Sequence, residues 1–148
     1  MLDHLRAINE TAAFNRWAGF EVVSASTGQV DLAINWREDF GQYAGFLHAG
    51  LTGALIDTAC GYAAVTQCGA VLASHNGVNM IAPPVGERFI ARGRVIKPGR
   101  RQIFTATELF AIKDGVEKLV ATGDAILVPM ESQTGRQIFP YAAREALA

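Results

Sequence analysis

A histidine and an aspartate nine residues apart have the types and spacing that could serve a reaction. His48 precedes Ala49-Gly50, and Asp57 follows on an otherwise apolar stretch. Burying a carboxylate is costly unless it is solvated, paired or used in chemistry. Asp57 is therefore either a catalytic acid or base, or a structural residue paired with a neighbour.

The stretch from residue 49 to about residue 68 has the spacing of one long helix with two unlike faces. Large residues recur at helical intervals on one face, namely Leu51, Leu55, Tyr62 and Val65. Small residues accompany Asp57 on the second face, namely Gly50, Gly53, Ala54, Gly61 and Ala64. Small side chains let another backbone or a ligand approach the helix closely.

The start of this helix is a second candidate for chemistry. The first backbone amides of a helix have no intrahelical partner and carry partial positive charge, so they can bind an oxyanion. Ala49 and Gly50 supply these amides. His48 occupies the position of an N-terminal cap, and we interpret it as orienting the loop rather than as transferring protons.

The remaining elements are predicted mostly as strands. Residues 2–17 have a helical pattern in which Thr11 is expected to cap a second short helix, and a hairpin follows at 20–24 and 29–36. After the long helix, four further strands are predicted at 71–81, 87–97, 101–113 and 116–128. A short terminal helix is possible at 141–147. This order predicts an α+β fold with one antiparallel sheet.

Length and composition narrow the class of protein. The 148 residues suit a single domain, with a helical segment at 2–17, a core at about 18–130 and a tail at 131–148. Half of the residues are hydrophobic and the net charge is −1, which argues against a nucleic acid as partner. No apolar run is long enough to cross a membrane and no secretory pattern is visible, so we expect a cytoplasmic protein.

The two cysteines and three histidines do not predict a metal site or a disulfide. Cys60 and Cys68 lie eight residues apart on the long helix, about 12 Å along its axis, which is too far for a bond between them. No Cys/His cluster has the spacing of zinc ligands. Free thiols fit a reducing compartment.

The segment G-F-L-H-A-G followed by L-I-D resembles hotdog-fold acyl-CoA thioesterases, in particular the PaaI-like, phenylacetate-degradation-type group. That family has the string H-G-G, an acid nine residues after the His, and an Asn or Gln six residues before it. His48, Asp57 and Gln42 match these positions, whereas Ala49 replaces the middle glycine. The resemblance covers roughly residues 15–128.

The resemblance implies an antiparallel sheet wrapped around the long helix and hydrolysis of an acyl- or aryl-CoA thioester to a free acid and CoA. Asp57 would act as base or nucleophile, and the amides of Ala49 and Gly50 would bind the oxyanion. Gln42 would hold the carbonyl or the attacking water. No metal or redox cofactor is implied, and coenzyme A enters only as part of the substrate.

Two further groups of residues are candidates for binding the substrate. The family often has a Ser or Thr near the start of the strand after the helix, where this chain has Ala73, so Ser74 could substitute only with a shift of register. His75 and Asn79 share the parity of Ala73 and are expected to line the site. Arg100 and Arg101, at a predicted turn, are candidates for the CoA phosphates.

Two other functions remain open from the sequence. The departures at Ala49 and Ala73 leave room for an acyl-CoA-binding protein without catalysis, and a thioester dehydratase or hydratase is a weaker alternative. The sequence does not identify the acyl group, because the aromatic residues near the motif could line a pocket for it but are also ordinary core residues.

The spacing of Ala49 and Asp57 predicts a site shared between two chains. Eight residues of one helix span about 12 Å, whereas a carbonyl carbon and its attacking group must come within about 3.5 Å of each other. Two antiparallel helices could bring the start of one level with the middle of the other. The resemblance likewise implies a homodimer, often doubled into a homotetramer.

Overall fold

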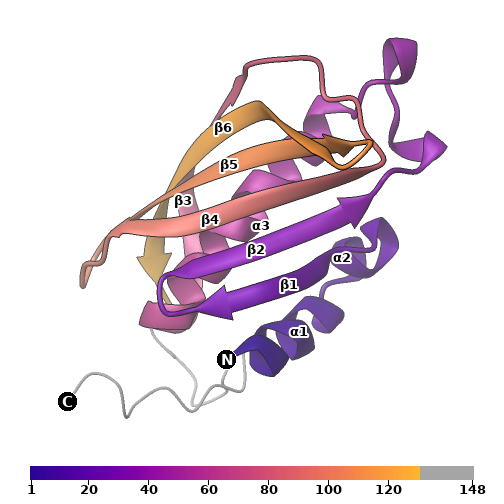
Figure 1. Cartoon of the computed structure of the whole chain (residues 1–148). Helices are drawn as coiled ribbons and strands as arrows, with labels where there is room; N and C mark the ends of the chain where they lie inside the picture. The colour runs from indigo at the N-terminus through magenta and orange to yellow at the C-terminus, as the bar shows by residue number, and fades with distance from the viewer. Residues whose placement is uncertain (131–148) are drawn as a thin grey trace.

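The computed structural model describes residues 1–130 and contains three α-helices, two short 3-10 turns and six strands (Figure 1). The helices are α1 (Leu2–Thr11), α2 (Ala13–Ala18) and α3 (Ala49–Cys68), and the 3-10 turns are η1 (Glu38–Phe40) and η2 (Tyr43–Gly45). The strands are β1 (Glu21–Ser26), β2 (Gln29–Asn35), β3 (Val71–Met80), β4 (Arg88–Lys97), β5 (Ile103–Lys113) and β6 (Val116–Pro129). The tail at 131–148 and the terminal helix expected at 141–147 lie outside the described residues.

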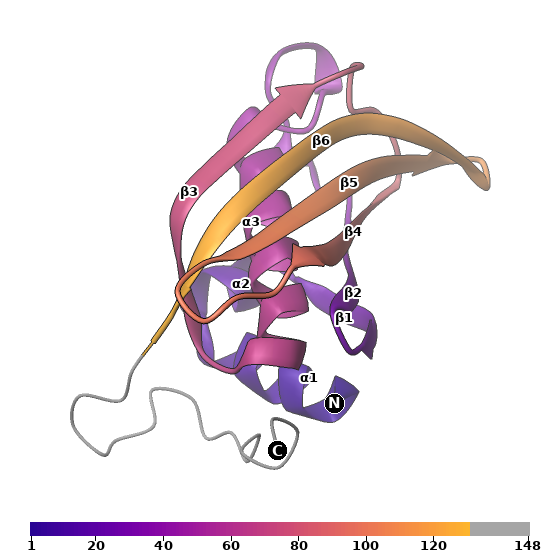
Figure 2. The same cartoon turned by 90° about the vertical axis from the view of Figure 1, so that its left-hand side faces the viewer.

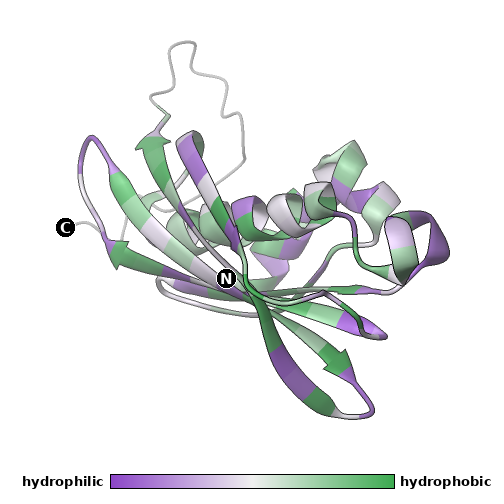
Figure 3. Cartoon of the chain, turned by 90° about the horizontal axis from the view of Figure 1, so that it is seen from above, coloured by the Kyte–Doolittle hydropathy of each residue, from purple (hydrophilic) through white to green (hydrophobic). Residues whose placement is uncertain are grey.

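The six strands form one antiparallel sheet in the order β1-β2-β4-β5-β6-β3. The sheet curls around α3, which contacts every strand, as the two side views show (Figures 1 and 2). Seen from above, the helices lie along one side of the curved sheet (Figure 3). The predicted fold is therefore confirmed, since an antiparallel sheet wraps around the long helix as in hotdog proteins.

The two faces predicted for α3 differ in burial. Its large residues are buried against the sheet and α1, namely Leu51, Leu55, Tyr62 and Val65. Its small-residue stripe stays half-exposed at Gly53, Ala54, Asp57 and Gly61, and Gly50 is exposed. The placement of Ala64 on the small-residue face is wrong, because Ala64 is fully buried and belongs to the core.

The N-terminal helices are fastened to α3 by a buried polar cluster. Asn15 Nδ2 donates to Tyr62 Oη at 3.0 Å and to Asn9 Oδ1 at 3.0 Å. The Tyr62 hydroxyl donates in turn to Asn9 Oδ1 at 3.0 Å. Burial raises the pKa of Tyr62 to about 12, so its hydroxyl keeps the proton that it donates. The expected cap at Thr11 is wrong, because its hydroxyl donates to the Ile8 carbonyl and no side chain caps α2.

Glycines in the sheet let α3 approach it closely. A Cβ added at Gly93 of β4 would lie 2.5 Å from the carbonyl oxygen of Ala59, and one at Gly123 of β6 would collide with Ile56. Such close contact removes apolar surface from water on both elements. None of the helices in residues 1–130 has both the length and the apolar composition to span a membrane.

We expect Gly93→Ala to lower the free energy of unfolding by about 1–3 kcal/mol, because the methyl group overpacks the contact between β4 and α3. Gly61→Ala is the matched control, since a Cβ there meets no atom within 4 Å. That change should leave stability equal or raise it by up to about 1 kcal/mol through helix propensity. Urea denaturation measures both, and equal effects would contradict the assigned close approach.

Candidate active site

Asp57 lies in the middle of α3, on its half-exposed stripe. Its Oδ1 accepts a hydrogen bond of 2.8 Å from Asn76 Nδ2 on β3. No cationic side chain among residues 1–130 forms an ion pair with it. The carboxylate is thus held by a neutral amide through one oxygen, and the other oxygen remains available to a water or a substrate carbon.

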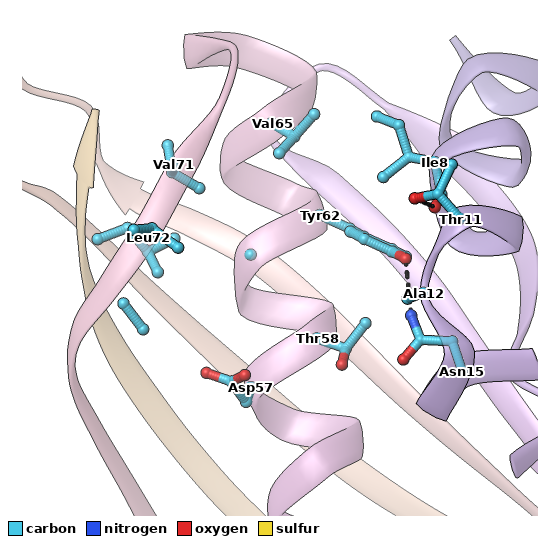
Figure 4. Close-up of a pocket in the computed structure, with 13 residues that line it drawn as sticks. Ile8, Thr11, Ala12, Asn15, Asp57, Thr58, Tyr62, Val65, Val71 and Leu72 are labelled. Carbon is cyan, nitrogen blue, oxygen red and sulfur yellow. Dashed lines mark hydrogen bonds between the residues drawn. The ribbon is translucent and has the colours of Figure 1, made fainter. Parts of the chain in front are cut away.

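A pocket of about 240 Å³ lies beside this carboxylate (Figure 4). Residues from α1, α2, α3, β3 and β6 line it. Figure 4 shows α1 and β3 flanking α3, with the Asp57 carboxylate directed toward the β3 side. The pocket therefore places the candidate acid beside a space between the N-terminal helices, α3 and the sheet. Its lining residues are Ile8, Thr11, Ala12, Asn15, Asp57, Thr58, Gly61, Tyr62, Val65, Val71, Leu72, Ala73 and Leu127.

The start of α3 presents one free amide. His48 caps the helix, because its Nδ1 accepts the Gly50 N–H at 2.9 Å. The main-chain N–H of His48 donates to the Phe40 carbonyl at 2.9 Å, which joins the cap to the preceding loop. The Ala49 N–H has no hydrogen-bond partner in the part of the chain that the structure describes. Of the two predicted oxyanion donors, Gly50 is therefore already engaged and Ala49 is free.

Gln42 lies close to this amide. Its Nε2 donates to the Leu47 carbonyl at 3.3 Å, and together with Ala49 it lines a second pocket of about 290 Å³. Thr52 lines the same pocket, and its buried hydroxyl has no partner within residues 1–130. Sequence reasoning missed Thr52, although its position one turn after His48 on the predicted helix was a signal for it.

A β-bulge at Ser74 decides which residues of β3 face α3. The register with β6 shifts between Ala73 and His75. Ala73 and Asn76 consequently both pair with buried residues of β6 that lie on the helix side of the sheet. Asn76 thus brings a polar group to the site where Ala73 has none.

His75 and Asn79 lie on the opposite face of the sheet. His75 Nε2 is 3.6 Å from Asp124 Oδ2, and both side chains are more than half exposed. The expectation that they share a face with Ala73 is wrong, because strict alternation does not allow for the bulge. The Ser74 hydroxyl donates to a main-chain carbonyl of β6 at 3.1 Å. A substrate-binding role for these three residues stays a prediction.

Asn76 is the second candidate site residue that sequence reasoning missed. It belongs to the polar run Ser74-His75-Asn76, which was visible in the sequence. Its partner Asp57 lies 19 residues earlier in the chain, so the contact depends on the strand register rather than on a local pattern.

Arg100 and Arg101 lie in the loop between β4 and β5, and they line neither the pocket beside Asp57 nor the pocket at the start of α3. Arg100 lines a pocket of about 450 Å³ with Cys68, at the end of α3 opposite to His48. Cys68 is about 16 Å beyond Asp57 along the helix axis. The role of both arginines in binding CoA phosphates stays a prediction. Two arginines of the preceding strand β4 form ion pairs, Arg88 with Glu21 and Arg92 with Glu117.

The cysteines are free thiols and take no part in the site. Cys60 Sγ lies 3.1 Å from Thr107 Oγ1 in the core, and burial raises the pKa of its thiol. Within residues 1–130, no group of three His, Cys, Asp or Glu side chains is arranged to hold a metal ion.

The fold and the site together define a class of protein. A carboxylate in the middle of the enclosed helix, with a free amide at the start of that helix, is the arrangement that the resemblance to hotdog thioesterases implies. The chain belongs to the thioesterase superfamily, whose family model matches residues 44–118. The predictions of hotdog-fold membership and of a thioesterase are thereby confirmed.

Individual relatives agree with this membership. Human acyl-coenzyme A thioesterase 13 is 31% identical over 123 residues, which cover 80% of this chain and 86% of the human protein. A thioesterase family protein from Silicibacter pomeroyi is 34% identical over 84% of this chain and 94% of its own, with a TM-score of 0.82. PaaI of E. coli, from the phenylacetic acid degradation operon, has a TM-score of 0.77 over 87% of this chain and 92% of its own. At a sequence identity of 20%, this similarity shows a shared fold alone.

We expect Asn76→Leu to lower kcat by about 10- to 100-fold with little change in KM, because the carboxylate loses the donor that orients it. Asn35→Leu is the control, since it makes the same change at an exposed residue of β2 that lines neither candidate pocket. Steady-state kinetics of thioester hydrolysis separate the two. An equal loss in both variants would contradict a specific role for the Asn76 amide.

Proposed function

We propose that this protein hydrolyses acyl-CoA thioesters to a free acid and CoA. The observation that carries the proposal is the carboxylate of Asp57, which has no cationic partner among residues 1–130, is fixed by Asn76 and lines an apolar pocket. Human acyl-coenzyme A thioesterase 13, a relative by sequence, bears a name that supports CoA as the carrier of the acyl group.

Asp57 acts on the thioester carbonyl by one of two routes. It takes a proton from a water that attacks the carbonyl carbon, or it attacks that carbon directly to form an anhydride that water then opens. In both routes the bond from carbon to sulfur breaks, the sulfur leaves as the CoA thiolate and gains a proton, and water supplies the second oxygen of the acid. The proposed reaction draws only on side chains, backbone amides and water.

The Ala49 amide is the proposed donor to the oxyanion that forms during the attack. It is free and lies at the positive end of α3, and Gln42 and Thr52 lie beside it. The replacement of glycine by alanine keeps this N–H. His48 contributes by capping the helix, which holds the loop in place. We assign the orientation of water or of the carbonyl to Gln42.

One chain cannot supply both halves of this site to one substrate. Ala49 and Asp57 belong to the same helix and are separated by about 12 Å along its axis. A second copy, related by a two-fold axis, would bring its own Ala49 level with Asp57. Two features support such a homodimer. Among residues 1–130, no strand lies beside the edge of β3 that faces away from β6, and the small-residue stripe of α3 is only partly covered.

We expect Asp57→Asn to lower kcat by at least about 100-fold while the fold is retained, because the amide is neither a base nor a nucleophile. Release of free CoA thiol from a panel of acyl-CoA substrates measures the activity. Asp31→Asn, on β2, is the control for the loss of one negative charge. Turnover of Asp57→Asn close to that of the unmodified protein would remove Asp57 from the mechanism.

The shared site predicts that two inactive variants restore activity when they are combined. Ala49→Pro removes the free N–H but preserves the helix start, because proline is favoured at the first helical position and His48 already has extended backbone angles (φ −61°, ψ 137°). Mixed dimers of Ala49→Pro with Asp57→Asn contain one intact site. Random pairing should restore roughly a quarter of the unmodified activity.

Ala49→Gly is the control for this experiment, since it keeps the amide and should remain active. Light scattering establishes that the mixed dimers form. No recovery of activity in such dimers, or full activity in a monomer, would contradict the shared site.

A further inference from the structure

The pocket beside Asp57 extends well beyond the carboxylate that it contains. We propose that this pocket holds the acyl group of the thioester, and that Gly61 and Ala12 set the largest acyl group that the enzyme accepts. The inference rests on the proposed function, because it assigns a place to one part of that substrate.

The surfaces of the pocket suit a hydrocarbon group. α1 and the residue after it contribute Ile8 and Ala12, α3 contributes Val65, and the strands contribute Val71 and Leu127. These aliphatic side chains come from both sides of the α3 stripe, as Figure 4 shows for α1 and β3. Pockets for apolar ligands are lined in this way, with only a few polar groups that fix orientation.

The wall formed by the N-terminal helices is rigid. Asn15 and Tyr62 both line the pocket and are joined by a hydrogen bond of 3.0 Å, which Figure 4 marks. Asn9 completes this buried cluster and donates to the Phe20 carbonyl at 2.7 Å. Because these groups satisfy one another, α1 and α2 cannot shift outward without breaking buried hydrogen bonds, so the pocket has a defined width.

The volume limits what the pocket can hold. It measures about 240 Å³, below the roughly 300–1,000 Å³ of sites that enclose a whole drug-sized ligand. An apolar cavity of about 150 Å³ is sufficient for benzene in another protein. The pocket is thus larger than a cavity that holds benzene and smaller than one that encloses a whole drug-sized ligand. This size suits a phenyl ring with a short spacer, or a straight acyl chain of similar bulk.

Gly61 and Ala12 keep this space open from two sides. Gly61 is one helical turn after Asp57, so an acyl chain that starts at the carboxylate and follows α3 passes over it. A Cβ added at Gly61 meets no atom within 4 Å, so no other part of residues 1–130 occupies the space above it. Ala12 lines the pocket from the junction of α1 and α2. Larger side chains at either position would therefore shorten the pocket.

The test compares acyl chain lengths in Gly61→Leu and in Ala12→Leu. The kcat/KM values for acetyl-, butanoyl-, hexanoyl-, octanoyl- and phenylacetyl-CoA are measured in each variant. We expect the ratio of octanoyl to butanoyl activity to fall at least about 10-fold in both, the low end for one methylene that no longer fits. Gly61→Ala should give a smaller change in the same direction.

Two control variants make the result specific. Ala13→Leu adds the same side chain at the next, exposed residue outside the pocket and should leave the ratio unchanged. Ala82→Leu fills the second pocket, beside Gln42 and Ala49, instead. A fall in the ratio for Ala82→Leu alone would place the acyl group in that second pocket and overturn the inference.

The remaining outcomes separate this inference from the proposed function. Absence of hydrolysis of every acyl-CoA by the unmodified protein would reject the proposed function. Hydrolysis with an unchanged ratio in Gly61→Leu and Ala12→Leu would reject the acyl pocket alone. Loss of activity on all chain lengths alike, with a change of oligomeric state in light scattering, would identify the pocket as a protein contact and would also reject it.

Discussion

The burial of α3 is the constraint on which the rest of the structure depends. Its body is apolar on nearly every side, and such a helix is stable in water only when other elements cover it. The sheet provides the cover by curling around it, and the glycines at positions 93 and 123 allow direct contact. Coverage is incomplete along one stripe of small residues, and Asp57 lies there. The place where a charged group is tolerated on this helix is thus also the place where a ligand can reach it.

Neighbouring groups engage part of each candidate catalytic group and leave the other part free. Asn76 holds one oxygen of Asp57 without the competing charge of a cation, so the second oxygen keeps its lone pairs for chemistry. At the helix start, His48 binds the Gly50 amide and leaves that of Ala49 unpaired. Both arrangements orient a reactive group in advance, which lowers the entropic cost of reaching a productive geometry.

The N-terminal helices extend the site beyond the residues of the family motif. The buried cluster of Asn9, Asn15 and Tyr62 ties them to α3, and they form one wall of the pocket beside Asp57. In the proposed site, Asp57 and the Asn76 amide that holds it belong to α3 and β3, whereas one side of the pocket wall comes from α1, α2 and Ala12 between them. Changes on that side can therefore alter the proposed acyl pocket without altering the candidate catalytic groups.

The sequence by itself determined the helix at 49–68, its large-residue face and the position of Asp57 on the other face. It also determined the strands at 101–113 and 116–128, and the two residues between them, Asp114 and Gly115, have the positive φ angles of a tight turn, 50° and 75°. These features follow from local spacing and backbone preference. Only the tertiary structure decided the contact of Asn76 with Asp57, the outward direction of His75 and the pocket wall at Ala12. The reason is physical: one extra residue in β3 reverses the face of every residue after it, and neither that bulge nor a contact between distant segments leaves a periodic trace in the sequence.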